Sequence, residues 1–257
     1  MVKMSIEKLD LTNSKGSKIS TVLSDLGKDF IVLLCHGYPS NKQREKYINL
    51  EKVLNTVSIS TLRFDFSGQG ESGGEFSEFN LSQGIDDLQS VISSIIDKGF
   101  QNIGLWGNSF GGSVAIQVTP KFPEINSLCL TAPVIDWKDQ KSKTKTKEEM
   151  NAWKENGFIR IKQREESKTL DIPYSFYQDS IQYNGYKAFS EIQVPILIIH
   201  GNRDEKVPIS LSKKAEELNS NAKLVILEGA NHHFSDKKHL DLLMGFSTEF
   251  FLRNKLY

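Results

Sequence analysis

Short β-type runs alternate with longer amphipathic stretches along the chain. Each run ends at a glycine, a proline or another turn-forming cluster, and residues 30–37 (FIVLLCHG) are almost wholly apolar. A run of that kind is typical of a strand that is covered on both faces of a sheet. The six runs span residues 30–37, 58–68, 102–107, 127–134, 194–202 and 222–229.

Between these runs, apolar side chains recur with helical spacing. Residues 81–98 repeat them at i, i+3 and i+4, and residues 210–218 and 236–252 follow a similar pattern. This alternation predicts an α/β fold with a mostly parallel central sheet that helices cover on both faces. The first stretch, residues 6–26, is expected to form a hairpin packed on one edge of the sheet.

One segment in the middle of the chain interrupts this rhythm, because no further core strand is indicated there. Its residues 157–163 alternate in polarity, which is typical of a hairpin strand. We therefore expect residues 134–194 to form a small inserted cap that contains a hairpin and a helix or two. The core would then comprise residues 1–133 and 195–257.

The same segment carries a lysine-rich run and several aromatic residues. We expect the run, residues 138–149, to be a solvated mobile loop, with attraction of anionic substrates as the alternative. The segment holds two of the three tryptophans, Trp137 and Trp153. Its aromatic side chains are expected to pack the cap onto the core, and an aryl-accepting pocket is the alternative.

Composition and charge exclude several classes of protein. The 257 residues are enough for one large α/β domain with a buried core. Basic and acidic residues balance at 32 each, so the charge indicates binding neither to nucleic acid nor to a membrane surface. No stretch approaches the roughly 20 apolar residues of a membrane span, and the start of the chain lacks the apolar core of a signal peptide.

The two cysteines, Cys35 and Cys129, both lie inside apolar runs. They are expected to be small buried side chains of a reduced, cytoplasmic protein rather than halves of a disulfide. Neither has the spacing of a metal ligand, so no metal site is expected.

The stretch Gly107-Asn108-Ser109-Phe110-Gly111 matches the pattern G-x-S-x-G. Chance alone produces such a match in roughly one chain of this length in ten. The context is more specific, because an apolar strand precedes the motif and a helical stretch follows it. A strand–turn–helix setting is what a nucleophile elbow requires, so Ser109 is expected to be a nucleophile. The alternative is a serine that only caps the helix.

A serine hydroxyl needs a base to take its proton and a carboxylate to orient that base. In this architecture the acid and then the histidine follow the serine along the chain. Asp204 comes just after a buried strand, and His232 comes just after the next one. We expect Asp204 to be the acid and His232 the base, with Glu205 and His233 as their substitutes.

The negative charge that develops during acyl transfer needs hydrogen-bond donors. Phe110 offers a backbone N–H at a helix N-terminus, where the dipole favours an anion. The second donor is expected from the loop after residues 30–35. Pro39 has no N–H, which leaves the backbone N–H of Tyr38. His36 is interpreted as a structural histidine that supports this loop.

Four separated motifs give the chain a clear resemblance to serine hydrolases of the α/β-hydrolase family. Within that family, the D-x-x-G-x-G-x-S run and the short cap are similar to bacterial cinnamoyl and feruloyl esterases. They also resemble the monoacylglycerol-lipase and serine-aminopeptidase-like branch. The motifs are HGYPSN at 36–41, RFDFSGQGES at 63–72, GNSFGG at 107–112, and the pair GNRDEKVP and GANHHF at 201–208 and 229–234.

The resemblance implies the same site residues, with Ser109 as nucleophile, Asp204 as acid, His232 as base, and the backbone N–H groups of Tyr38 and Phe110 as oxyanion donors. It also implies a structural role for the D-x-x-G-x-G-x-S run. One departure concerns the residue before the nucleophile, since Asn108 stands where many of these esterases have histidine.

We therefore expect a serine esterase that cleaves short-chain or aromatic acyl esters through an acyl-enzyme, without a cofactor. A lysophospholipase or monoacylglycerol lipase, a thioesterase and an aminopeptidase-type hydrolase use the same triad and remain alternatives. A non-catalytic binding module is the rival from another class. The expected partner is a small-molecule ester, and the sequence leaves a homodimer open.

Overall fold

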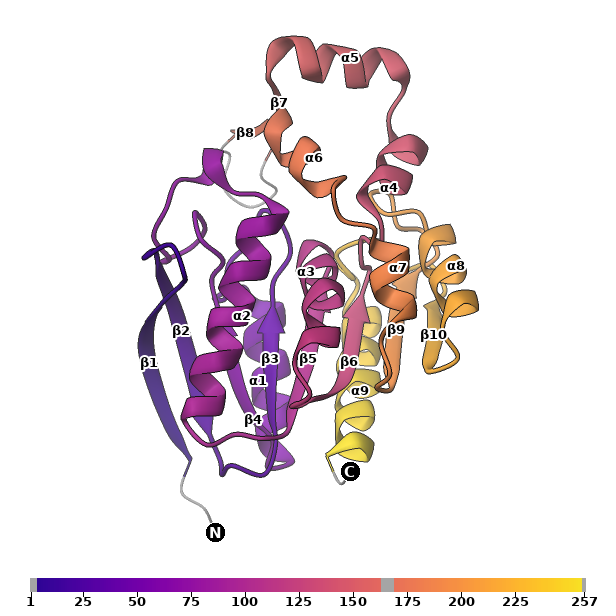
Figure 1. Ribbon diagram of the computed structural model, residues 1–257. Helices are drawn as coiled ribbons and strands as arrows, with labels where there is room; N and C mark the ends of the chain where they lie inside the picture. Colours follow the sequence, from indigo (N-terminus) through magenta and orange to yellow (C-terminus); the bar gives the residue numbers. More distant parts are fainter. Residues whose placement is uncertain (1–3, 163–168, 256–257) are drawn as a thin grey trace.

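A mostly parallel eight-stranded sheet forms the centre of the protein (Figure 1). This computed structural model describes residues 4–162 and 169–255. The strand order is β1-β2-β4-β3-β5-β6-β9-β10, and the first two strands form the expected antiparallel hairpin at one edge. The strands are β1 (Ser5–Thr12), β2 (Lys18–Asp25), β3 (Ile31–Cys35), β4 (Ser60–Phe64), β5 (Ile103–Asn108), β6 (Ile125–Thr131), β9 (Ile196–Gly201) and β10 (Ala222–Leu227).

Helices cover both faces of the sheet, which confirms the predicted fold class. Every residue of β3, β4 and β5 is buried, as their apolar composition requires. One face packs against α2, α3 and α8, and the other packs against α1 and α9 (Figure 1). These helices are α1 (Glu45–Thr56), α2 (Leu81–Asp97), α3 (Phe110–Val118), α8 (Ser210–Leu218) and α9 (Lys237–Asn254).

Most of the chain between β6 and β9 lies beyond the carboxyl ends of the parallel strands, at the top of Figure 1, and its last helix packs instead against α3 and α8 beside the sheet. It contains a separate two-stranded antiparallel sheet and four helices, more than the one or two expected. Its division from the core at residues 134 and 194 stays a prediction. The elements are α4 (Trp137–Thr144), α5 (Lys147–Asn156), β7 (Phe158–Lys162), β8 (Thr169–Pro173), α6 (Tyr174–Ser180) and α7 (Gly185–Ser190).

The prediction of a loop for the lysine-rich run is wrong, because that run forms α4 and the start of α5. The Asp136 side chain accepts a hydrogen bond from the Asp139 backbone N–H and caps α4. A reciprocal capping box between Thr146 and Glu149 starts α5. The Lys141 ammonium also lies over the rings of two tryptophans. These local contacts offset the mutual repulsion of the lysines.

Aromatic side chains pack the segment between β6 and β9 onto the core. The ring of Phe176, from α6, stacks on Tyr38 with ring centroids 4.9 Å apart. Tyr38 stacks in turn on Phe76 at 5.2 Å. Trp137 meets Phe176 edge to face at 5.0 Å, and both are buried. This arrangement agrees with the interpretation that the aromatic residues serve packing.

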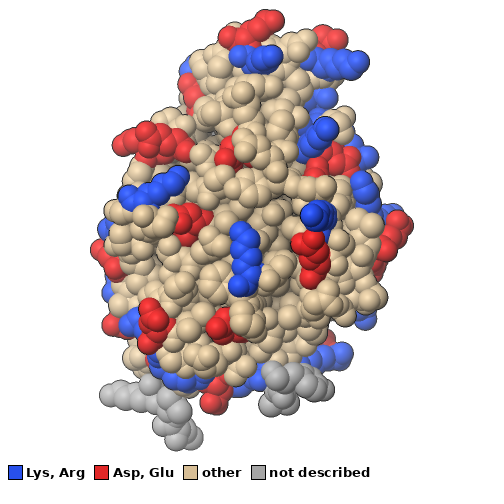
Figure 2. All heavy atoms as spheres, in the orientation of Figure 1, with Lys and Arg blue, Asp and Glu red and all other residues tan. Residues whose placement is uncertain are grey.

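Charges of both signs are interspersed over the surface. On the face shown in Figure 2, lysine and arginine side chains alternate with aspartate and glutamate without forming a single-sign patch. Among the described residues, no helix combines the length and apolar character needed to cross a membrane. Cys35 and Cys129 are buried free thiols, as expected.

Candidate active site

Ser109 lies on a sharp turn between β5 and α3, with φ +52° and ψ −110°. Two glycines make this turn sterically feasible. A Cβ atom on Gly111 would lie 2.3 Å from the carbonyl oxygen of Cys35, and one on Gly107 would lie 2.8 Å from the carbonyl oxygen of Gly111. The first and last positions of G-x-S-x-G therefore exclude every other residue type because the backbones approach so closely.

The Gly111→Ala substitution is expected to lower the free energy of unfolding by about 2–4 kcal/mol, because the new methyl group meets backbone atoms that cannot move aside. Gly245→Ala is the matched control. Gly245 is an exposed residue of α9 with nothing within 4 Å of its would-be Cβ. That change should raise stability by up to about 1 kcal/mol. Urea unfolding of both variants measures the difference, and equal stabilities would contradict the steric account.

The structure brings Ser109, His232 and Asp204 together at the carboxyl ends of β5, β10 and β9. His232 Nε2 lies 3.2 Å from Ser109 Oγ. His232 Nδ1 lies 2.7 Å from Asp204 Oδ2. Both the imidazole and the carboxylate are largely buried, with 7% and 1% of the side chain exposed. An ionised carboxylate only accepts, so Nδ1 carries the ring proton and Nε2 can accept the serine proton.

The carboxylate of Asp204 is fixed on both of its oxygens. Oδ1 accepts the backbone N–H groups of Lys206 at 2.8 Å and Val207 at 2.7 Å. Burial opposes its ionisation, but hydrogen bonds from His200 and His232 outweigh it and hold the pKa of Asp204 well below its usual range. Asp204 therefore stays charged at any pH at which the protein would work.

His200 is a second histidine on the same carboxylate, and sequence reasoning assigned it no role. Its Nε2 lies 3.1 Å from Asp204 Oδ2 and 3.0 Å from the carbonyl oxygen of Val207. A carbonyl only accepts, so Nε2 carries the proton and donates to Asp204. Nδ1 then accepts from the Ser212 hydroxyl at 2.7 Å. The signal in the sequence was its place at the end of β9, four residues before Asp204.

The two substitute residues occupy other positions around the site. Glu205 is exposed, and its Oε2 accepts the backbone N–H of His232 at 3.3 Å. His233 Nε2 lies 3.0 Å from the ammonium nitrogen of Lys206. The imidazole that meets Ser109 is that of His232, and the carboxylate that meets this imidazole is that of Asp204.

The two expected oxyanion donors come from different parts of the chain: Tyr38 lies in the loop after β3, and Phe110 is the first residue of α3, directly after Ser109. Within the described part of the chain, no acceptor is recorded for the backbone N–H of Tyr38 or of Phe110. His36 Nε2 accepts the N–H of Phe66 at 3.1 Å, so its Nδ1 carries the proton and donates to the Gly37 carbonyl at 2.7 Å. Because a peptide's C=O and N–H point in opposite directions, this bond orients the Tyr38 N–H. The contacts agree with the structural interpretation of His36.

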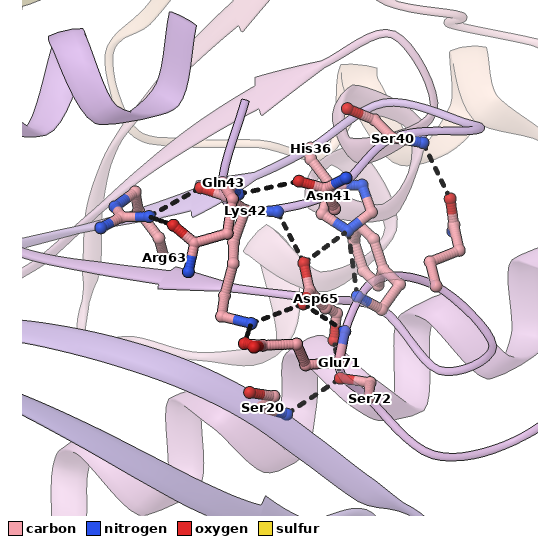
Figure 3. A network of polar contacts seen from close by, with 12 residues as sticks. Ser20, His36, Ser40, Asn41, Lys42, Gln43, Arg63, Asp65, Glu71 and Ser72 are labelled. Carbon is pink, nitrogen blue, oxygen red and sulfur yellow. Dashed lines mark hydrogen bonds and ion pairs between the residues drawn. The ribbon is translucent and has the colours of Figure 1, made fainter. Parts of the chain in front are cut away.

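A buried polar network supports the loop that follows Tyr38 (Figure 3). Asp65 accepts the backbone N–H and the ammonium of Lys42, both at 2.6 Å, and the backbone N–H of Glu71 at 2.8 Å. Ser72 Oγ donates to the Asp65 carbonyl at 2.6 Å. A Cβ on Gly70 would lie 2.2 Å from Asp65 Oδ2. The D-x-x-G-x-G-x-S run thus folds around one carboxylate.

A cavity of about 590 Å³ opens beside Ser109 and His232. Of the segment between β6 and β9, only Ile161 and Lys162 are among its described lining residues. The tryptophans of that segment do not line it. The alternative of an aryl-accepting pocket built from them therefore gains no support from this cavity.

Asn108 joins three elements directly beside Ser109. Its Oδ1 accepts from the Lys46 ammonium at 2.9 Å and from the Tyr47 hydroxyl at 3.1 Å. Its Nδ2 donates to the Thr131 carbonyl at 3.0 Å. An amide has the acceptor and the donor that these neighbours require, so this departure from the esterase pattern fits its surroundings. Sequence reasoning missed Lys46, which lies far from the motifs along the chain.

Comparison with known proteins adds independent information. A family model described as serine aminopeptidase, S33, matches residues 28–172. The mitochondrial palmitoyl-protein thioesterase ABHD10 of Pongo abelii is 25% identical over 224 residues, which cover 85% of this chain and 72% of that protein. The lysophosphatidylserine lipase ABHD12 of Danio rerio is 25% identical over 209 residues, which cover 75% of this chain and 48% of that protein.

Solved structures share the whole fold at low sequence identity. Est1E from Butyrivibrio proteoclasticus, in a structure with bound ferulic acid, aligns with a TM-score of 0.83 at 21% identity. The alignment covers 97% of this chain and all of that one. A protein of Agrobacterium vitis S4 that is named a putative hydrolase aligns with a TM-score of 0.81 at 18% identity over 96% of this chain and 99% of that one.

Proposed function

The chain belongs to the serine aminopeptidase S33 family and is an α/β-hydrolase, and from this premise we propose that it cleaves carboxylic esters of short-chain or aromatic acids. Ser109 is the nucleophile, His232 the base and Asp204 the orienting acid. The observation that carries the proposal is the continuous contact from Ser109 Oγ through His232 to Asp204. Because the imidazole and the carboxylate are buried away from water, each hydrogen bond in this contact is stronger.

The reaction proceeds in two acyl transfers. His232 Nε2 takes the Ser109 proton as Oγ attacks the ester carbonyl, and Asp204 stabilises the imidazolium that forms. The N–H groups of Tyr38 and Phe110 donate to the tetrahedral oxyanion. His232 then gives its proton to the departing alcohol, which leaves an acyl group on Ser109. In the second transfer, His232 takes a proton from a water molecule as the water oxygen attacks the acyl carbonyl. The bond to Ser109 Oγ then breaks, His232 returns the proton to Oγ, and the carboxylic acid is released.

The names of the relatives motivate two alternatives on the same triad. The palmitoyl-protein thioesterase suggests a thioester as the alternative substrate, and the lysophosphatidylserine lipase suggests a lysophospholipid. The ferulic acid bound to Est1E motivates our choice of oxygen esters. The fold itself does not separate the two classes, because mouse alpha/beta hydrolase domain-containing protein 10 aligns over 98% of this chain with a TM-score of 0.79. We further propose that residues 134–194 act as a cap that contributes Ile161 and Lys162 to the cavity wall.

A substrate panel tests this assignment. It compares 4-nitrophenyl esters of increasing chain length, methyl ferulate, a monoacylglycerol, an acyl thioester and an aminoacyl anilide. We expect the highest kcat/KM for a short-chain or aromatic ester. Turnover of the thioester or the anilide alone would replace the ester proposal by the corresponding alternative.

The pH dependence follows from the environment of His232. Burial lowers the pKa of His232 below its ordinary 6.5, and the hydrogen bond to Asp204 offsets only part of that shift. The neutral imidazole is the active form, so activity persists above the pKa and is lost as the pH falls through it. The acid limb of kcat/KM is therefore expected to have its midpoint below 6.5. A midpoint above 7, or a flat profile down to pH 4, would contradict a buried histidine base.

A further inference from the structure

Lys46 lies in the first turn of α1, and its ammonium lines the cavity beside the nucleophile. Its Nζ donates to Asn108 Oδ1, and Asn108 directly precedes Ser109. It also lies 5.6 Å from the ring centre of Tyr47 and 5.9 Å from that of Phe234. An ammonium has three donors, and within the described residues the Asn108 amide is the one hydrogen-bond partner recorded for it.

Among the residues that the structure describes, no carboxylate forms an ion pair with this ammonium, although burial shields the ammonium from water. Burial lowers the pKa of Lys46 to about 8, and the charge of Asp204 offsets part of that shift. The Lys46 charge also acts on His232, whose pKa it lowers. A buried ammonium with a hydrogen bond from only one of its N–H groups binds an incoming anion with a more favourable free energy than a hydrated surface lysine does.

Basic side chains outnumber acidic ones among the described residues of the cavity wall. Arg44, Lys46, Lys162 and Lys206 line it, against Glu45 as the one carboxylate among the described lining residues. The excess of basic over acidic residues in this wall contrasts with the balanced charge of the whole chain, which has 32 basic and 32 acidic residues. A concave wall of one sign raises the local concentration of ligands of the other sign.

We propose that the substrate is an ester that carries a carboxylate, and that the Lys46 ammonium binds this carboxylate. The inference rests on the proposed function, because it assigns the substrate class of the same site. Lys46 adjoins Ser109 through Asn108, so a carboxylate a few bonds from the scissile carbonyl can reach the ammonium. The carboxylate belongs either to the acyl part or to the alcohol part of the ester, and the substrates below distinguish the two.

The test compares three esters on the wild-type protein and two variants. Mono-4-nitrophenyl glutarate carries a carboxylate on the acyl part, 3-butyryloxy-4-nitrobenzoate carries one on the alcohol part, and 4-nitrophenyl butyrate is neutral. Lys46→Met removes the charge and keeps the length, and it should raise KM for at least one carboxylate ester about 10-fold to 100-fold. The effect is read as the ratio of that KM to the KM for the neutral ester, which carries no carboxylate for the ammonium to bind. Lys46→Arg should retain the low KM because it keeps the charge.

Lys52→Met is the matched control, because Lys52 is an exposed lysine of the same helix outside the cavity wall. It should leave all three KM values unchanged. If Lys46→Met lowers kcat equally for all three esters and changes their KM values by the same factor, Lys46 acts only through Asn108 and the proposal is overturned. Unchanged KM values for both carboxylate esters would also overturn it.

A binding measurement separates this inference from the proposed function. Monomethyl glutarate is titrated into Ser109→Ala by calorimetry, with and without Lys46→Met, which requires no turnover. A Kd that rises about 10-fold on loss of the lysine supports the anion site even if the wild-type protein hydrolyses no ester. Hydrolysis of the neutral ester together with a Kd and KM values insensitive to Lys46 would refute the anion site and leave the esterase proposal standing.

Discussion

Replacement of Ser109 by alanine is expected to lower kcat/KM for ester hydrolysis by a factor of about 10⁴–10⁶. The hydroxyl oxygen is the atom that would form the acyl-enzyme, and no nearby group replaces it. The fold should persist, because among the described residues Ser109 Oγ has a hydrogen bond only with His232. Hydrolysis of 4-nitrophenyl butyrate measures the loss, and circular dichroism checks the fold.

Ser113→Ala is the matched control for that substitution. Ser113 lies one turn further along α3, and its hydroxyl donates to the Val134 carbonyl instead of facing His232. This variant should lose about 1 kcal/mol of stability and keep its turnover. If Ser109→Ala retained a tenth or more of the wild-type rate while Ser113→Ala did not, the nucleophile would be assigned wrongly.

The second large effect is expected from His232→Gln, which should reduce kcat/KM by a factor of about 10⁴. Glutamine keeps a polar side chain of similar size but cannot take the serine proton. His233→Gln tests the neighbouring histidine, which contacts Lys206. We expect that variant to stay within a few-fold of the wild type. The reverse outcome would move the base to His233 and contradict the contact between His232 and Ser109.

Much of the fold could be predicted because the strands are buried on both faces. Uniformly apolar runs such as Ile31–Cys35 can be recognised without any tertiary information. Helix α1 escaped notice because its start carries no side-chain cap, at Arg44, and its buried residues are few. The lysine-rich run was mistaken for a loop because its charge was given more weight than a local helix signal, the Thr146–Glu149 capping box. The contact of Lys141 with Trp153 of the next helix appears only in the folded chain.

Some residues of the candidate site could likewise be predicted from the sequence, and others could not. Chain order and strand ends were enough to select Ser109, Asp204 and the pair of adjacent histidines, and the family resemblance singled out His232, which the fold brings into contact with Asp204 and Ser109. The choice between two adjacent histidines depends on backbone direction, which periodicity does not determine. His200 had one signal in the sequence, its place at the end of β9 four residues before Asp204. Its contact with Asp204, like the contact of Lys46 with Asn108, exists only once the loops and α1 have packed together.

The central claim is that Ser109 carries the acyl group between two transfers. The most direct test is to quench the wild-type protein with acid while it turns over 4-nitrophenyl butyrate and to locate the butyryl group by peptide mass spectrometry. We predict a butyryl ester on the peptide that contains Ser109, absent from the Ser109→Ala variant. Turnover with no adduct, or an adduct on another residue, would contradict the account.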